Sequence, residues 1–308
     1  MHRRQCGRTD LTVSRLGLGT WTWAHDTGTD VAAAQLRTFL DAGGTLVDTA
    51  AAYGDGRAEE LLGTVLRTAV RRDEVVIATK AGAADVVDTS RRAMLSTLDD
   101  SLRRLGTDHV DLWQVHAWSD TVPVAETLGA LDEAVRSGRC RHVGICNYAG
   151  WQAARAATVQ QLTGAAPLAT HQTQYSLLHR EPEREVVPAA RALGTGVLAW
   201  SPLAGGVLSG KYRQGTPAGT RATVDRYVPY LRPFLDDADA DAIVSAVCLT
   251  AGALGRSPAE VALAWVRDRP GVTAALIGAR TGDQLRTALD SESLDLPDEI
   301  TELLDDAS

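Results

Sequence analysis

Four side chains of complementary chemistry lie at or near the ends of three consecutive apolar runs. Asp48 ends TLVD, Lys80 ends VVIATK and His116 ends VDLWQVH, while Tyr53 follows Asp48 by five residues in the turn-rich stretch DTAAAYGDG. A nearby ammonium lowers the pKa of an acid by about 1 to 3 pH units, and a carboxylate keeps that ammonium protonated. We therefore expect Asp48 and Lys80 to tune Tyr53 as a general acid for a carbonyl oxygen that His116 orients.

Each of these residues has a simpler interpretation when it is taken alone. Asp48 could cap a turn, Tyr53 could be a packed aromatic residue, Lys80 a solvated strand end and His116 a satisfied core histidine. The coincidence of all four at the ends of consecutive runs favours carbonyl reduction. Lysine usage agrees, because Lys80 and Lys211 are the only lysines among 31 basic side chains. A chain that otherwise uses arginine is expected to keep lysine where a compact ammonium is needed.

These residues require a scaffold that brings the ends of separate strands together. Short apolar runs alternate with amphipathic segments along the chain. The predicted strands are 15–20, 45–48, 75–80, 110–116, 141–147, 168–173, 196–200 and 273–278. The predicted helices are 30–42, 58–70, 90–105, 122–137, 149–162, 183–193, 239–254 and 258–268. Because each parallel strand needs a crossover, this order predicts an α/β fold, a TIM (β/α)8 barrel forming a single domain over residues 1–308.

Two segments fall outside this alternation. RRQCGRTDLTVS, residues 3–14, reads as an N-terminal β-hairpin that would close the bottom of the barrel. Residues 201–235 form the longest irregular stretch, and loops of that length are usually functional or disordered. In a barrel of this kind the active site lies at the C-terminal ends of the strands, where Asp48, Lys80 and His116 are expected to stand in a row.

Composition excludes several classes of function. The formal charge is −8, from 39 acidic and 31 basic residues without a dense basic cluster, so a nucleic-acid partner is not expected. The N-terminal stretch lacks the apolar segment of a secretory signal, and no apolar run is long enough for a bilayer, so we expect no membrane partner and a cytoplasmic location. The four cysteines are widely spaced without a CxxC pair, which predicts reduced thiols and no metal site.

The chain resembles the aldo-keto reductases over nearly its whole length. The resemblance rests on SRLGLGTW, DTAAAYG, IATK, DLWQVH, VGICNY, HQTQYSLL, AWSPLAGGVLSGKY and IGAR with a downstream glutamine, in that order. It implies a barrel that binds NADP(H) without a Rossmann domain, and GLGTWT accordingly lacks the third glycine of GxGxxG. By position it implies that hydride passes from nicotinamide C4 to an aldehyde or ketone and that Tyr53 supplies the proton. Asp48 and Lys80 would tune Tyr53, and His116 would position the carbonyl.

The resemblance also implies a set of cofactor-binding residues. Asn147 and Gln172 correspond to the positions that hold the carboxamide, and Trp200 to the ring that stacks on the nicotinamide. The loop from Ser201 to Lys211 would wrap the pyrophosphate, and Arg280 suits a 2′-phosphate because its guanidinium donates bidentately. The full set is Gly19, Thr20, Trp21, Asp48, Cys146, Asn147, Gln172, Trp200, Ser201, Pro202, Leu203, Gly205, Lys211, Arg221, Gly278, Arg280 and Gln284.

Three positions depart from the commonest pattern of the family. Cys146 stands where serine is usual, and a thiol is the weaker donor to a carboxamide. Trp200 replaces a frequent tyrosine, which stacking tolerates. Ala288 replaces an asparagine that usually contacts adenine, so binding of the dinucleotide is expected to be less tight.

Other functions are compatible with the same residues. AWSPLAGGVLSGKY also resembles the β subunits of voltage-gated potassium channels, so a cofactor-binding regulatory or sensor subunit is the alternative to an enzyme. An isomerase or sugar-phosphate barrel would carry a glycine-rich phosphate site after strands seven and eight, for which SPLAGG could be mistaken. Trp21, Trp23, Trp118 and residues 227–230 could line an aromatic substrate pocket or pack the barrel. The carbonyl substrate, the direction of reaction, the strictness of NADPH preference and the oligomeric state are not readable from the sequence.

Overall fold

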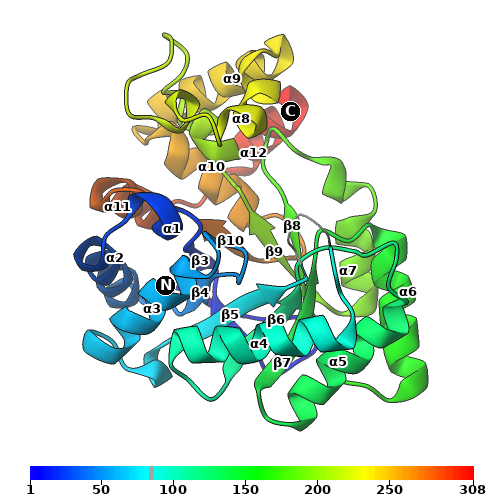
Figure 1. Cartoon of the computed structure of the whole chain (residues 1–308). Coiled ribbons are helices and arrows are strands. Elements are labelled where there is room, and N and C mark those ends of the chain that lie inside the picture. Colours follow the sequence, from blue (N-terminus) through cyan, green and yellow to red (C-terminus); the bar gives the residue numbers. More distant parts are fainter. Residues whose placement is uncertain (83–86) are drawn as a thin grey trace.

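Eight parallel strands form a closed barrel at the centre of the molecule (Figure 1). The computed structural model describes residues 1–82 and 87–308, apart from the side chains of Ala24 and Asp26. The strands are β3 (Leu16–Gly19), β4 (Leu46–Asp48), β5 (Val76–Ala81), β6 (Val110–Val115), β7 (Cys140–Cys146), β8 (Leu168–Gln174), β9 (Gly196–Trp200) and β10 (Val272–Ile277). They pair in the order β10-β3-β4-β5-β6-β7-β8-β9. The predicted TIM (β/α)8 barrel is therefore confirmed, with all eight strands in place.

Helices surround the strands, and most of them lie where the sequence predicts them. The predicted helices correspond to α2 (Thr29–Asp41), α3 (Arg57–Thr68), α4 (Arg91–Leu105), α5 (Val124–Arg136), α6 (Gly150–Thr163), α7 (Val186–Leu193), α9 (Ala238–Leu254) and α10 (Pro258–Arg267). The sequence did not predict α1 (Trp23–Asp26), α8 (Val228–Leu235), α11 (Gly282–Asp290) and α12 (Asp298–Ala307). The short 3-10 helices are η1 (Arg72–Glu74), η2 (Glu181–Glu183), η3 (Ala204–Ser209), η4 (Arg221–Thr223) and η5 (Ser291–Ser293).

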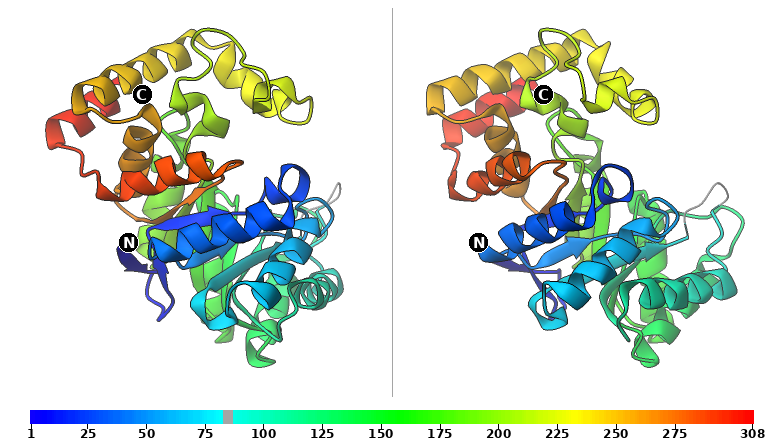
Figure 2. Two further views of the ribbon diagram at one scale, coloured as in Figure 1. Left: turned by 90° about the vertical axis from the view of Figure 1, so that its left-hand side faces the viewer. Right: turned by 60° about the vertical axis from the view of Figure 1, so that its left-hand side comes forward.

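The C-terminal helices complete the ring of helices around the barrel. Both views of Figure 2 show α11, in orange, lying beside α2, in blue. The helix that follows the last strand is therefore a neighbour of the helix that follows the first strand of the barrel. Thr281 caps α11, since its side chain accepts a hydrogen bond from the backbone N–H of Gln284. α8, α9 and α12 gather together at the top of Figure 1.

The N-terminal hairpin closes one end of the barrel, as predicted. β1 (Arg3–Gln5) pairs antiparallel with β2 (Thr12–Ser14). Its apolar residues form one buried cluster with side chains from six barrel strands; this cluster comprises Cys6, Leu11, Val13, Leu46, Ala78, Leu112, Ala169, Leu198, Ala274 and Leu276. Leu46 and Ala78 each stand two residues before Asp48 and Lys80. Because side chains on a strand alternate between its faces, Asp48 and Lys80 point into the same barrel interior, at its opposite end.

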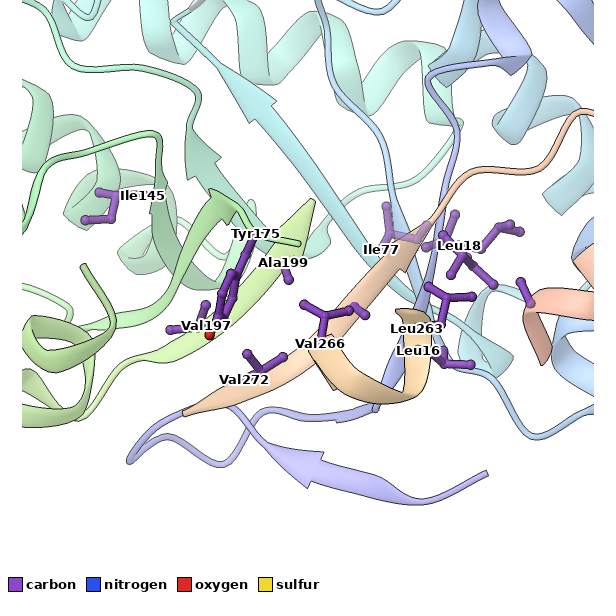
Figure 3. Packing of buried hydrophobic residues seen from close by; sticks show 14 of the residues in the cluster. Leu16, Leu18, Ile77, Ile145, Tyr175, Val197, Ala199, Leu263, Val266 and Val272 are labelled. Atoms are coloured by element: carbon purple, nitrogen blue, oxygen red, sulfur yellow. The ribbon is translucent and has the colours of Figure 1, made fainter. Parts of the chain in front are cut away.

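A larger apolar layer joins the outer face of the barrel to the helices. Figure 3 shows Leu263 of α10 close to Leu16 and Leu18 of β3, and Val266 of the same helix over β10. All four side chains are fully buried, and burying a leucine completely contributes about 1.5–3 kcal/mol of transfer free energy. This layer holds the strands rigidly, so the positions at their C-terminal ends are fixed relative to one another.

α9 leads into α10 through a sharp bend of 102°. Among the described residues, no individual helix combines the length and apolar composition needed to cross a membrane, whereas α9 and α10 would meet that criterion only when taken together.

Candidate active site

A buried lysine links an aspartate to a tyrosine at the C-terminal end of the barrel. Lys80 Nζ donates to Asp48 Oδ2 at 2.6 Å, to the backbone oxygen of Thr49 at 2.9 Å and to Tyr53 Oη at 3.1 Å. Lys80 is 1% exposed and Asp48 is 3% exposed. Lys80 is the penultimate residue of β5 rather than its last, which brings its amine beside the end of β4. An ammonium has three donors, so all of those on Lys80 are occupied and its position is fixed.

The charge on Lys80 is secured by its neighbours. Burial alone would lower the pKa of the Lys80 amine, but Asp48 and Tyr53 raise it above its ordinary value. The amine is therefore an ammonium throughout the neutral range. As an ammonium it cannot accept a proton, so its effect on Tyr53 is electrostatic.

The expected net lowering of the Tyr53 pKa is wrong. Burial raises the pKa of the Tyr53 hydroxyl to about 12, and this effect exceeds the opposing effect of the Lys80 charge. Asp48 raises it further. At neutral pH Tyr53 is therefore protonated. Because its oxygen accepts a hydrogen bond from Lys80, the Tyr53 hydrogen is left to point elsewhere, and the hydroxyl lines the adjacent cavity.

His116 completes the predicted group of four. It directly follows β6, and its ring lies 6.0 Å from the Tyr53 ring in an edge-to-face arrangement. Burial, together with the Lys80 charge, lowers the pKa of His116 to about 3. The imidazole is thus neutral, with one ring N–H that can donate to a ligand oxygen without bringing a competing charge.

Amide side chains from β7 and β8 support this group from the opposite side of the barrel. Gln172 Nε2 donates to Asp48 Oδ1 at 2.8 Å, and the Cys146 thiol contacts Gln172 Oε1 at 3.7 Å. Asn147 Nδ2 donates to the backbone oxygen of His116 at 3.1 Å, and Trp200 Nε1 donates to Asn147 Oδ1 at 2.9 Å. Each amide keeps one N–H and some acceptor capacity for a ligand.

All four predicted catalytic residues adjoin one cavity of about 710 Å³, either by lining it or, for Lys80, through Tyr53. A cavity of this size fits a cofactor-sized molecule. The predicted cofactor residues that line it are Gly19, Trp21, Asp48, Cys146, Asn147, Gln172, Trp200, Ser201, Pro202, Leu203, Gly205, Lys211, Arg221, Gly278, Arg280 and Gln284. Thr20 is the exception. Its hydroxyl and N–H both bond to the backbone oxygen of Asp48, so it is buried behind the cavity and holds the strand end.

The segment after β9 turns back sharply over the cavity. Ser201 and Ala204 have φ values of 54° and 47°, followed by Gly205 at 67° and Gly206 at 100°. A Cβ at Gly205 would lie 2.4 Å from Leu231 Cδ2, and one at Gly206 would lie 2.7 Å from Lys211 Nζ. The positive φ favours glycine at both positions, and at Gly205 the close contact with Leu231 on α8 adds to this preference.

Three cations, Lys211, Arg221 and Arg280, converge near this turn. Burial first, then the charges of Arg221 and Arg280, lowers the pKa of Lys211 to about 8. Arg221 Nη1 donates to the backbone oxygen of Gly205 at 3.2 Å, while the buried Arg221 Nε has no hydrogen-bond partner. Such mutual repulsion and an orphaned donor are relieved by a bound anion, so the donors present fit the phosphates of a dinucleotide.

Several cavity residues were not predicted from the sequence. They are Thr22, Gly206, Ser209, Arg226, Ser257, Pro258, Ala259, Leu276, Ile277, Ala279, Asp283 and Thr287. Ser257 to Ala259 begin α10, whose Ser257–Glu260 capping box is visible in SPAE and could have suggested a helix start. Nothing in the sequence indicates that this helix start faces the cavity.

The aromatic residues near the rim divide between cavity and packing. Trp21 and Tyr230 line the cavity, whereas Tyr227 is buried and packs edge-on against Trp21 with ring centroids 5.1 Å apart. Trp23 is buried, and its Nε1 donates to Gln35 Oε1 at 2.8 Å. Trp118 instead packs against two aromatic side chains outside the cavity, those of Tyr148 and Trp151.

Sequence comparisons agree with this geometry. The model of the Aldo/keto reductase family matches residues 15–308. An "Uncharacterized oxidoreductase YrpG" of Bacillus subtilis (strain 168) is 38% identical, covering 97% of this chain and 94% of the relative. An "L-glyceraldehyde 3-phosphate reductase" of Escherichia coli (strain K12) is 34% identical, over 92% of this chain and 86% of the relative. A "Probable voltage-gated potassium channel subunit beta" of Oryza sativa subsp. japonica is 33% identical, over 92% of this chain and 89% of the relative.

The match extends over both the barrel and the segments that line its cavity, and two of these relatives carry oxidoreductase or reductase in their names. The chain therefore belongs to the aldo/keto reductase family, oxidoreductases that act on carbonyl compounds.

Proposed function

We propose that this protein is an NADP(H)-dependent reductase of aldehydes or ketones in which Tyr53 is the general acid. The observation that carries the proposal is the Tyr53 hydroxyl, which lines the cavity while its oxygen accepts a hydrogen bond from a fully coordinated ammonium. A hydroxyl held in this way has its own hydrogen available for a ligand oxygen. In the resting protein the Tyr53 hydroxyl is therefore ready to donate its hydrogen to a carbonyl oxygen, and it is not ready to accept a hydrogen from an alcohol.

The chemistry requires a hydride and a proton to reach the two ends of a C=O bond. When it is bound, the reduced nicotinamide supplies the hydride to the carbonyl carbon. Tyr53 transfers its proton to the carbonyl oxygen as negative charge develops there, and Lys80 stabilises the phenolate that this leaves. Asp48 keeps Lys80 in place and charged. Neutral His116 donates its N–H to the same oxygen and so fixes the direction of the carbonyl.

The side chains around the cavity support a nicotinamide dinucleotide. Asn147 and Gln172 are each anchored by one N–H of the side-chain amide and can offer the other N–H to a carboxamide. Trp200, held by its Nε1 bond to Asn147, offers a ring face for stacking. Lys211 and Arg221 are suited to the pyrophosphate because they flank the Gly205–Gly206 turn.

NADP(H) in preference to NAD(H) is the finer part of the proposal. It is supported by the third cation, Arg280, whose charge acts on both Lys211 and Arg221. The Arg280 backbone N–H is held by Gln284 Oε1 at 2.9 Å, which leaves the guanidinium to bind a 2′-phosphate. We also propose that residues 1–308 act as a single domain, because the hairpin and the C-terminal helices both complete one barrel.

The test compares Tyr53→Phe with the wild type in an assay of NADPH oxidation against a panel of aldehydes and ketones. The panel includes glyceraldehyde 3-phosphate, the compound in the name of the Escherichia coli relative. Loss of a general acid is expected to reduce turnover by about 10²- to 10⁴-fold while the dissociation constant for NADPH changes little. Tyr175→Phe is the matched control, because its hydroxyl bonds to Glu183 away from the cavity. Full activity in Tyr53→Phe would refute the assignment.

A regulatory or sensor subunit is the alternative, and the similarity to the rice channel-subunit relative favours it. The two functions differ in turnover. An enzyme releases the oxidised dinucleotide and repeats the reaction, whereas tight retention of the dinucleotide with negligible turnover on every member of the panel would favour the regulatory function.

A further inference from the structure

Tyr230, on α8, contacts the turn that follows β9. Tyr230 Oη lies 2.6 Å from Ser201 Oγ, and Gln174 Nε2 donates to the same Tyr230 oxygen at 3.3 Å. Ser201 Oγ in turn accepts a hydrogen bond from the backbone N–H of Gly205 at 3.2 Å. A single chain of hydrogen bonds thus runs from the end of β8 through α8 to the turn.

The number of donors and acceptors sets a direction for this chain. A phenol is a stronger donor and a poorer acceptor than an aliphatic hydroxyl, and Gln174 already donates to the Tyr230 oxygen. Either hydroxyl could donate in this pair, and these two facts favour Tyr230 as the donor to Ser201. The Ser201 oxygen then accepts twice, from Tyr230 and from Gly205, and its own hydrogen has no acceptor within this chain of bonds.

That remaining hydrogen belongs to a residue that lines the cavity. Arg221 reaches the neighbouring turn through its bond to the Gly205 oxygen, and Lys211 Nζ lies beside Gly206. Ser201 thus faces the region where the protein gathers positive charge. A hydroxyl whose lone pairs are occupied is selective for an acceptor, and phosphate oxygens are strong acceptors.

We propose that Tyr230 is a positioning residue that makes the Ser201 hydroxyl an obligate hydrogen-bond donor to a phosphate oxygen of the bound dinucleotide. This inference rests on the proposed function and adds a residue from α8 to the recognition of the cofactor. α8 is well placed for the role, because a Cβ at Gly205 would lie 2.4 Å from Leu231 Cδ2 and 3.1 Å from Tyr230 Cε1. The helix therefore packs directly on the turn that carries Ser201.

The experiment is a double-mutant cycle read by binding rather than by turnover. Dissociation constants for NADPH are measured by quenching of tryptophan fluorescence for the wild type, Tyr230→Phe, Ser201→Ala and the double variant. Tyr230→Phe keeps the ring and its packing and removes only the hydroxyl. Loss of one charge-assisted hydrogen bond predicts about tenfold weaker binding for each single variant, and less than about threefold further loss in the double variant. Tyr175→Phe controls for the loss of a bonded phenol hydroxyl elsewhere.

A second ligand separates this role from general damage to the cavity. Nicotinamide mononucleotide lacks the adenosine half, and its reduced form is measured with the same variants. If Ser201 contacts the phosphate on the adenosine side, the variants should lose less affinity for this mononucleotide than for NADPH. If Ser201 contacts the phosphate on the nicotinamide side, the two losses should be equal. Either result supports the Tyr230–Ser201 relay, that is, the action of Tyr230 on the cofactor through the Ser201 hydroxyl, when Tyr230→Phe and Ser201→Ala weaken binding to the same extent. Unchanged NADPH affinity in Tyr230→Phe beside a loss in Ser201→Ala, or fully additive losses, would overturn it. A wild-type protein that binds no nicotinamide dinucleotide overturns the proposed function itself, and the relay with it.

Discussion

The burial of Tyr53 predicts opposite pH responses for the two directions of the reaction. In the proposed reaction, reduction consumes the protonated hydroxyl, which is the resting form because burial raises the Tyr53 pKa to about 12. Alcohol oxidation needs the phenolate as a base. The perturbation is therefore the pH of the reaction, varied between 6 and 9 in the two directions separately.

The raised pKa sets the size of each effect. Because this pKa lies far above the assay range, only a small fraction of Tyr53 is a phenolate in the ligand-free protein, and this fraction rises about tenfold with each pH unit. The chemical step of reduction should thus change less than about twofold from pH 6 to 9, while that of oxidation should increase about 100-fold from pH 6 to 8. The positive charge of an oxidised nicotinamide lowers the Tyr53 pKa, so the increase ends below pH 12. Neutral His116, with its pKa near 3, adds no titration in this range.

The assay is a single-turnover measurement that follows the near-ultraviolet absorbance of the reduced nicotinamide after rapid mixing. A saturating dinucleotide removes the titration of Lys211, whose pKa near 8 affects binding rather than the chemical step. Tyr53→Phe is the control, and its residual oxidation rate should lose the pH dependence. A reduction rate that falls with an apparent pKa between 7 and 9 would show that burial does not dominate at Tyr53, and the reasoning would fail.

Three further outcomes follow from the buried groups. Lys80→Met should lower the free energy of unfolding by about 3–5 kcal/mol in urea titrations, because it leaves Asp48 buried without its ion-pair partner. Adding Asp48→Asn to this variant should restore much of the lost stability. An unchanged urea midpoint in Lys80→Met would contradict the prediction. Arg280→Ala should weaken NADPH binding at least about tenfold more than NADH binding, whereas equal losses would remove its 2′-phosphate role. His171 is buried and its pKa is lowered to about 4, below its unfolded value of about 6.5, so its contribution to stability is present above pH 6.5 and falls by about 2 kcal/mol by pH 5. His171→Gln should flatten this acid sensitivity, and an equal slope in both proteins would count against it.

The fold could be predicted because its strands are read from short apolar runs separated by helical periodicity. β4 and β9 begin or end within a residue of their predicted bounds. The sequence failed where a helix carries weaker signals. Pro229 and Pro233 made α8 read as part of an irregular stretch, and α11 and α12 follow the last strand, where the pattern of strand and crossover was already complete. Pro229 lies in the first turn of α8, where proline is compatible with a helix, whereas Pro233 lies inside the helix, where proline usually disfavours it.

The meeting of Asp48, Tyr53, Lys80 and His116 could be predicted from the sequence, but their electrostatics could not. Parallel strands bring Asp48 and Lys80 to one end of the barrel, so their meeting follows from order and spacing. The net effect on Tyr53 does not, since it depends on how much water the folded protein excludes. Ser257 enters the cavity only through the orientation of α10, which is not encoded in local periodicity.

A buried ion pair such as Asp48–Lys80 is weak support for a role in stability. Replacing such a pair with packed apolar residues is often neutral or stabilising, because the cost of removing two charges from water offsets their attraction. The pair is understandable if its task lies in the reaction. In the proposed mechanism, burial keeps the proton on Tyr53 until a carbonyl oxygen begins to gain negative charge, and the adjacent Lys80 ammonium then stabilises the phenolate in the same dry surroundings where its attraction is strongest. Burial and charge therefore act at different stages of proton transfer, and a tyrosine with only one of them would either lose its proton too early or fail to release it.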